Sequence, residues 1–159
     1  MERQADAKGG YAVTVHEKEE LVSKGIRALD HKHTHLALVC FERASAIGSS
    51  ATISSGLGYC LAAARGEIDR GLVLCREAVS QEPDRVFLYR NLGNVLLLAG
   101  KSNEAIEVFR AGLRIGKDDN IIRKLDSLGT RKPPMFKSLG RKHLLNRIFG
   151  LLSDRLGFR

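Results

Sequence analysis

The residues with the clearest capacity for chemistry are three histidines that alternate along one short stretch, His31, His33 and His35. Neutral imidazole nitrogens bind Zn²⁺ or Ni²⁺, and Asp30 beside them supplies a carboxylate. The stretch lies in an expected turn between two helices, however, and Lys32 adds a positive charge that repels a cation. No cysteine and no second histidine cluster lies near it in the sequence. We therefore predict a solvated turn and no metal site.

No other group of residues has the spacing of a catalytic or nucleotide-binding site. The pair Gly56 and Gly58 begins a dinucleotide-binding fingerprint, but Leu61 stands where the third glycine is needed. A Walker A phosphate loop is also missing from the sequence. Serine, histidine and aspartate occur, but no pattern marks one of them as a nucleophile or base. The sequence therefore predicts a protein that is not an enzyme and needs no cofactor.

The cysteines and the apolar runs indicate where such a protein would act. Cys40, Cys60 and Cys75 are odd in number, form no C-x-x-C pair, and each falls inside an expected helix. This pattern favours small buried thiols in a reducing compartment. Residues 1–20 contain no apolar run long enough for a secretory signal, and no stretch of about 20 apolar residues could span a membrane. We expect a cytoplasmic location, with association at the inner membrane surface as the alternative.

The positive charge is concentrated at one end of the chain. The whole sequence carries a net charge of +8, and eight lysines or arginines against one acid lie in residues 130–159. The same segment contains apolar residues at helical spacing: Leu144, Leu145, Ile148, Phe149, Leu151, Leu152 and Leu156. The gain from burying these side chains and the entropy lost on ordering the segment are similar in size. Such a segment is not stable as a free helix, so we expect it to dock on something.

Helical periodicity is clearest from Val86 to Asp119, where apolar residues recur at intervals of three and four. Gly100 is expected to end the first helix there, because glycine tolerates a positive φ. Ser102 is the expected N-cap of the second helix, since its hydroxyl can accept a backbone N–H bond. This stretch therefore predicts two short helices joined by a tight turn.

The same pattern recurs with a period of 34 residues. A small residue is followed four positions later by a larger one, and three positions after that by another small one. The three sets are Ala37, Phe41 and Ala44; Gly71, Cys75 and Ala78; and Ala105, Phe109 and Gly112. A small residue lets two helices approach closely, and the larger one fills the space beside it. Because no unit can bury its apolar face alone, the units must stack on one another.

The order Leu92, Gly93, Gly100, Ala105 and Phe109 resembles the tetratricopeptide repeat, a 34-residue helix–turn–helix unit. The resemblance implies an all-α fold, a right-handed superhelical array of repeats that works as a protein-interaction scaffold or adaptor. It also implies that an extra helix covers the exposed end of the array. The expected parts are a flexible N-terminal arm (1–17), three repeats (18–51, 52–85 and 86–119), a capping helix (120–129) and the basic amphipathic segment (130–159).

In this family the first helix of each repeat lines a concave groove in which peptides bind, so the register implies which residues face a partner. They are Val22, Ser23, Ile26, Leu29, Leu57, Cys60, Ala63, Ala64, Arg90, Asn91, Asn94, Leu97 and Leu98. The alternative is that Ile26, Leu57 and Leu98 only pack helices together.

Family members that bind chaperones hold a peptide's terminal carboxylate with Lys and Asn residues from several repeats. Here only Arg90, Asn91 and Asn94 could do so, and the first repeat lacks the basic residues. We therefore predict an apolar peptide or helix as the ligand, supplied by another protein or by the chain's own C-terminal segment. The alternative is a peripheral tether to an anionic membrane. Nucleic acid is not expected, because stacking aromatics are not interleaved with the basic residues.

Overall fold

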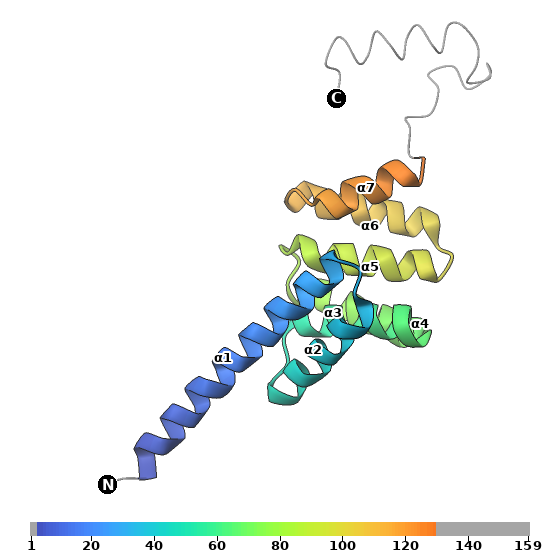
Figure 1. The fold of residues 1–159 in the computed structure, drawn as a ribbon. Coiled ribbons are helices and arrows are strands. Elements are labelled where there is room, and N and C mark those ends of the chain that lie inside the picture. Colours follow the sequence, from blue (N-terminus) through green and yellow to red (C-terminus); the bar gives the residue numbers. More distant parts are fainter. Residues whose placement is uncertain (1–2, 130–159) are drawn as a thin grey trace, which may run out of the picture. The chain divides into compact units, whose positions relative to one another are not determined.

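The computed structural model describes residues 3–129, with side chains from Thr14 onward, and this part of the chain contains helices and no strand. Figure 1 shows α1 (Arg3–Asp30), α2 (Thr34–Ile47), α3 (Ala51–Arg65), α4 (Ile68–Gln81), α5 (Val86–Leu98), α6 (Ser102–Ile115) and α7 (Asp119–Ser127). The predicted all-α fold is confirmed.

Consecutive helices pack in pairs, α1 with α2, α3 with α4 and α5 with α6. Helix α3 also packs against α2 and α5, and α4 packs against α5, so each pair rests on the next. The second helices α2, α4 and α6 begin at Thr34, Ile68 and Ser102, 34 residues apart as the sequence predicted, and the first helices α3 and α5 begin 35 residues apart. The division into units at 18–51, 52–85 and 86–119 remains our proposal.

Contacts between phenylalanine rings and glycines explain how the residues that recur every 34 positions pack the helices together. The ring of Phe41 in α2 is fully buried against Gly25 of α1 and Gly56 of α3, where an added Cβ would lie within 3.0 Å of it. Phe109 of α6 is buried in the same way against Gly93 of α5. The rings therefore occupy space that only a residue without a side chain leaves open.

The middle pair uses a different close contact. Gly58 of α3 and Gly71 of α4 face each other, and a Cβ on Gly71 would lie 2.6 Å from the carbonyl oxygen of Gly58. The small thiol of Cys75 takes the place of the ring, and it donates to the carbonyl of Ser55 at 3.4 Å. The backbones of α3 and α4 approach more closely because both sides of the contact are small.

The turns follow the expected chemistry at Gly66 and Gly100 but not at Lys32 and Ser102. Gly66 and Gly100 end their helices at φ values of 72° and 74°, in the left-handed region that glycine tolerates. Lys32 occupies the corresponding place after α1 at a φ of 62°, a conformation that is disfavoured for a residue with a side chain. The predicted N-cap role of Ser102 is wrong, because Ser102 is the first residue of α6 and Lys101 precedes it without a side-chain cap.

The prediction of a flexible arm at 1–17 is wrong for residues 3–17, which belong to helix α1. The carboxylate of Glu17 pairs with Arg43 of α2 at 3.3 Å, and Leu21 is buried in the core. A helix held along its C-terminal half is already nucleated, and each residue added toward Arg3 then contributes one hydrogen bond. The long α1 therefore extends past the pair that it forms with α2.

Helix α7 begins one residue before the range predicted for the capping helix, 120–129, and ends inside it. Ile121 is fully buried, and its Cδ1 would lie 3.3 Å from a Cβ at Gly112 of α6. Asp118 accepts hydrogen bonds from the N–H groups of Asn120 and Ile121 at 2.9 and 3.0 Å, which begins the helix. The segment at 130–159 lies outside the described residues, so its predicted amphipathic role stays a prediction.

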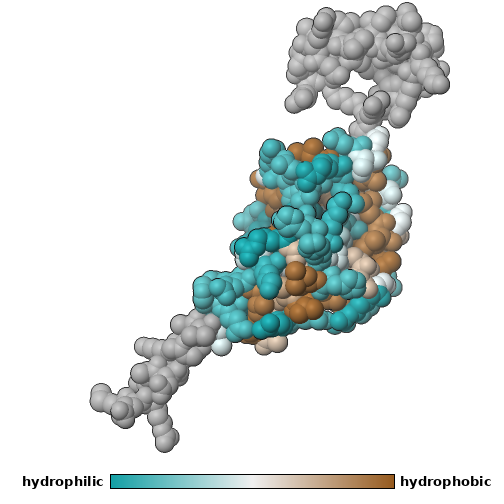
Figure 2. Space-filling view, in the orientation of Figure 1, coloured by the Kyte–Doolittle hydropathy of each residue, from teal (hydrophilic) through white to brown (hydrophobic). Residues whose placement is uncertain are grey.

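The surface of the described residues is mixed in character. Figure 2 shows hydrophilic residues over most of the face in view, with hydrophobic areas between them. Large apolar side chains that are more than a third exposed are Leu36, Val39, Val73, Leu98 and Ile115. None of the helices in this part of the chain is long and apolar enough to cross a membrane.

Candidate functional site

A cleft of about 430 Å³ opens along one face of α1. Five of its residues lie on one face of α1, at spacings of about one helical turn. Its lining is formed by Lys18, Glu19, Val22, Ser23 and Ile26 from α1, Ser50, Thr52 and Ile53 at the start of α3, and Glu82 and Arg85 between α4 and α5. The cleft therefore lies between α1, the start of α3 and the connection from α4 to α5.

The cleft combines an apolar base with a charged rim. Val22 and Ile26 are half-buried against the core around Phe41, and Ile53 is fully buried. Glu82 and Arg85 form an ion pair with each other, and Arg85 also donates to the hydroxyl of Thr52 at 3.4 Å. A ligand here meets aliphatic carbons below and hydrogen-bonding groups of both charges at the edge.

The structure brings three of the predicted groove residues, Val22, Ser23 and Ile26, together in this cleft. The other apolar ones, Leu29, Leu57 and Ala64, are half-buried and pack against the same core as Val22 and Ile26. Ile26 packs on the core and also lines the cleft, so its packing role is observed and its contact with a partner stays a prediction. Ala63 and Leu98 are exposed, and Leu97 and Asn94 are half-buried.

Two of the predicted groove residues are fully enclosed between helices, and a third, Arg90, is also buried, at 9% exposed. Cys60 is fully buried within the core around Phe41. Asn91 is 1% exposed and donates to the hydroxyl of Ser55 at 3.1 Å. Their placement in the groove is wrong because both side chains point between helices, where the contacts of α3 with its neighbours enclose them.

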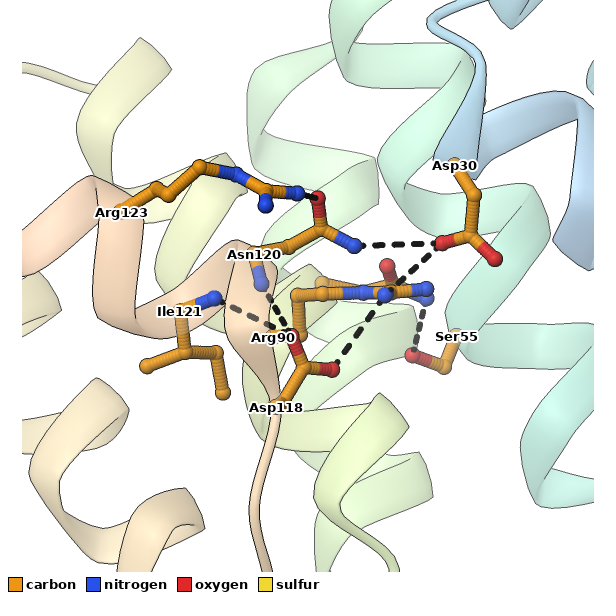
Figure 3. A network of polar contacts seen from close by, with 8 residues as sticks. Asp30, Ser55, Arg90, Asp118, Asn120, Ile121 and Arg123 are labelled. Atoms are coloured by element: carbon orange, nitrogen blue, oxygen red, sulfur yellow. Dashed lines mark hydrogen bonds and ion pairs between the residues drawn. The ribbon is translucent and has the colours of Figure 1, made fainter.

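Arg90 lies at the centre of a polar network that joins three parts of the fold (Figure 3). Its Nη1 lies 2.9 Å from Oδ1 of Asp30, at the end of α1, and 3.2 Å from Oδ2 of Asp118, before α7. Asn120 donates to the same oxygen of Asp30 at 3.3 Å. The guanidinium also lies over the ring of Phe87, 5.1 Å from its centroid. The predicted groove residue Arg90 is thus held by groups of its own chain.

Most of this network carries no signal in the amino-acid sequence. Asp30 lies in the histidine-rich turn, far from Arg90 in the chain, and no periodicity connects the two. Asp118 does carry a recognisable signal, because an aspartate before the apolar run that starts at Ile121 is a typical N-cap. The cleft residues Lys18 and Glu19 lack such a signal, since charged residues on a helix are usually only solvated.

The three cysteines are free and buried, as the sequence predicted. Burial raises the pKa of Cys60 and the pKa of Cys75 from the ordinary thiol value of 9.0 to about 12. The thiolate is the reactive form of cysteine, so these two thiols are poor nucleophiles in the folded protein. Their role is to pack the core.

This burial predicts slow reaction with thiol reagents. At pH 8, the folded protein is expected to react with Ellman's reagent far more slowly than the protein unfolded in guanidinium, which should release three equivalents at once. The measurement is the absorbance of the released thiolate against time in both states. Rapid release of two or more equivalents from the folded protein would contradict the burial of Cys60 and Cys75.

The described residues contain no cluster of three His, Cys, Asp or Glu side chains that could hold a metal ion. The rings of His31 and His33 lie 6.3 Å apart at their centroids. They flank the exposed turn after α1.

Comparison with solved structures identifies the fold. No protein-family model matches the sequence, and no curated protein matches it either. Among solved structures, the second TPR domain of human RPAP3, in complex with the HSP70 peptide SGPTIEEVD, is 14% identical with a TM-score of 0.53. It covers 74% of this chain and 99% of that domain. The TPR domain of Sgt2 from Aspergillus fumigatus is 18% identical with a TM-score of 0.51, over 82% of this chain and 93% of the other.

The chain therefore has the fold of a tetratricopeptide repeat domain, as the 34-residue period predicted. The cleft is lined mainly by α1 and the start of α3, and the network around Arg90 joins α5 to the end of α1 and to the segment before α7.

Proposed function

We propose that the chain is a non-enzymatic protein-interaction adaptor that binds an apolar peptide or helix of a partner protein in the cleft beside α1. The observation that carries this proposal is the cleft itself, with aliphatic residues Val22, Ile26 and Ile53 at its base. The similar domain of RPAP3 is described in complex with a peptide, which supports the same class of function.

The size and chemistry of the cleft favour an apolar anchor flanked by uncharged or mixed polar groups. A volume of about 430 Å³ holds a few side chains from a peptide or from one face of a helix, but not a complete helical turn. Burying one Leu-sized side chain contributes roughly 1.5–3 kcal/mol, so two anchors contribute about 3–6 kcal/mol before the entropy of binding is subtracted, and hydrogen bonds to the peptide must add to them. The hydroxyls of Ser23, Ser50 and Thr52 can bond the peptide's backbone.

A substitution that fills the cleft without removing a core contact tests this proposal. Ser23 is exposed and lines the cleft, so the ring of Ser23→Tyr should occupy the space of a ligand side chain. We expect peptides selected against the wild-type protein from a random display library to be apolar. We also expect them to bind at least tenfold more weakly to Ser23→Tyr by fluorescence anisotropy.

The matched control is Ser45→Tyr, an exposed serine on α2 that lies outside the cleft. It should bind the selected peptides like the wild type, and both variants should keep the wild-type circular dichroism spectrum. Selection without enrichment, or equal binding to both variants, would exclude the cleft as the binding site.

The membrane tether was the alternative prediction. It depends on residues 130–159, which lie outside the described residues, and no observation in the described part of the chain favours it.

A further inference from the structure

Helix α7 has little apolar surface buried against the rest of the array. It contains nine residues, fewer than the roughly 12–15 that an isolated helix needs to be stable in water. Ile121 is the one fully buried residue of this helix, and Ile122 and Leu125 are half-buried. The packing of Ile121 on α6 is therefore supplemented by other contacts that keep α7 in place.

Those contacts are polar, and they lie at the start of the helix. Asp118 accepts from the N–H groups of Asn120 and Ile121 through Oδ1 and pairs with Arg90 of α5 through Oδ2. The side-chain amide of Asn120 donates to Oδ1 of Asp30 at 3.3 Å. Figure 3 shows Asp30 and Asp118 approaching the guanidinium of Arg90 from different elements. The start of α7 is thus tied both to α5 and to the end of α1.

The tie to α1 crosses the array. Asp30 and Asn120 are 90 positions apart in the chain, whereas the units of a repeat array usually contact only their neighbours. The helices that pack on α1 are α2 and, over a short stretch, α3. Among the described residues, α1 forms no comparable packing with α5 or α7. Polar side chains therefore join the first helix to the last one.

The two carboxylates in this tie are not equivalent. Asp118 uses both oxygens, one of them to begin α7, and its side chain is 14% exposed. Asp30 uses one oxygen for both Arg90 and Asn120, and its side chain is 40% exposed. Asp30 is also the last residue of α1, where the helix dipole repels a negative charge, so α1 itself does not need it. The Asp30 contacts can open without unfolding α1.

We propose that Asp30, Arg90 and Asn120 form a latch that couples the first helix pair to α7. When the Asp30 contacts open, α7 is released from the array while the three helix pairs stay folded. This is a conformational device that controls the order of the last described helix. It does not depend on peptide binding in the cleft beside α1.

The charges explain how such a latch responds to its surroundings. Without Asp30, the side chain of Asn120 loses its acceptor, and α7 keeps only the Asp118 cap and the packing of Ile121. A helix of nine residues then opens more often. Salt screens exposed charge pairs more than buried ones, so the contact between Asp30 and Arg90 weakens before the contact between Asp118 and Arg90.

The test measures amide hydrogen exchange of the full chain by NMR. We expect Asp30→Ala to lower the protection of the amides of residues 122–125 at least tenfold, although the substitution lies in α1. The amides of Leu61 in α3 and Cys75 in α4 should keep their wild-type protection. Asp30→Asn should have a smaller effect than Asp30→Ala, because its amide oxygen can still accept from Asn120.

Salt provides a second readout. Raising NaCl from 50 to 500 mM should lower the protection of residues 122–125 in the wild type, and this dependence should be much weaker in both Asp30 variants. Circular dichroism shows whether the variants fold. Asp30→Asn keeps the shape of the side chain, so its salt dependence tests the latch even if Asp30→Ala unfolds.

Asp84→Ala is the matched control, since it removes one negative charge at an exposed turn. It should keep both the protection of residues 122–125 and its salt dependence. The latch is refuted if Asp30→Ala leaves this protection within twofold of the wild type, or if the amides of Leu61 and Cys75 lose protection to the same extent. The exchange measurement needs no peptide, so this proposal and the proposed function fail separately.

Discussion

Phe41→Ala is expected to lower the free energy of unfolding by about 3–5 kcal/mol, the usual range for emptying a buried phenylalanine site. The ring is fully buried and fills the space between Gly25 of α1 and Gly56 of α3. Because Gly25 and Gly56 are glycines in helices, neither has a side chain that could move into the cavity that the ring leaves. The loss therefore falls at the high end for this kind of substitution.

Thermal or urea unfolding followed by circular dichroism measures the effect. A domain of this size has a total stability of about 5–15 kcal/mol, so the variant should melt well below the wild type. Val73→Ala is the matched control, since Val73 is an apolar side chain 54% exposed on α4. Its stability should change by less than about 0.5 kcal/mol. Similar unfolding curves for the two variants would show that Phe41 does not join α1 and α3.

Gly71→Ala is expected to destabilise the protein by about 1–3 kcal/mol, although alanine is normally the better helix residue. The added Cβ would lie 2.6 Å from the carbonyl oxygen of Gly58 and 2.9 Å from Cβ of Ala62. Neither neighbour is the end of a flexible side chain, so α3 and α4 must move apart. That movement weakens every contact along this helix pair.

Gly48→Ala provides the control for adding a methyl group at a glycine. The φ of Gly48 is 173°, an extended conformation open to any residue, and the nearest atom to its Cβ would be the tip of Lys18 at 3.5 Å. Its melting temperature should stay within a degree or two of the wild type. A stable Gly71→Ala variant would mean that the approach of α3 and α4 is looser than the structure shows.

The repeat was predictable because it depends on the sizes of side chains that lie close together in the sequence. Ala37 and Phe41 recur as Ala105 and Phe109 at twice the 34-residue period, and these residues are buried in the structure. A small residue and a ring at this spacing lead to the same helix contact wherever they occur. The prediction of a flexible arm at 1–17 failed because residues 3–17 have no helical pattern of their own. They extend a helix that is nucleated further along the chain.

The residues that line the cleft beside α1 were only partly predictable. Register alone placed Val22, Ser23 and Ile26 beside an open cleft, since residues one turn apart on α1 share a face. The same register also placed Cys60 and Asn91 there, and both are buried. The burial of these two side chains depends on how closely the neighbouring helix approaches them. The residues around Cys60 and Asn91 in the sequence do not determine that distance.

By itself, the sequence determined the all-α fold, the period of 34 residues and the buried thiols, because each follows from side-chain size and spacing within a few helical turns. Only the tertiary structure decided that Arg90 is held by Asp30 and Asp118, which approach it from opposite directions along the chain. An ion pair needs two groups within about 4 Å, and stacking of the helix pairs alone sets that distance for residues so far apart in sequence.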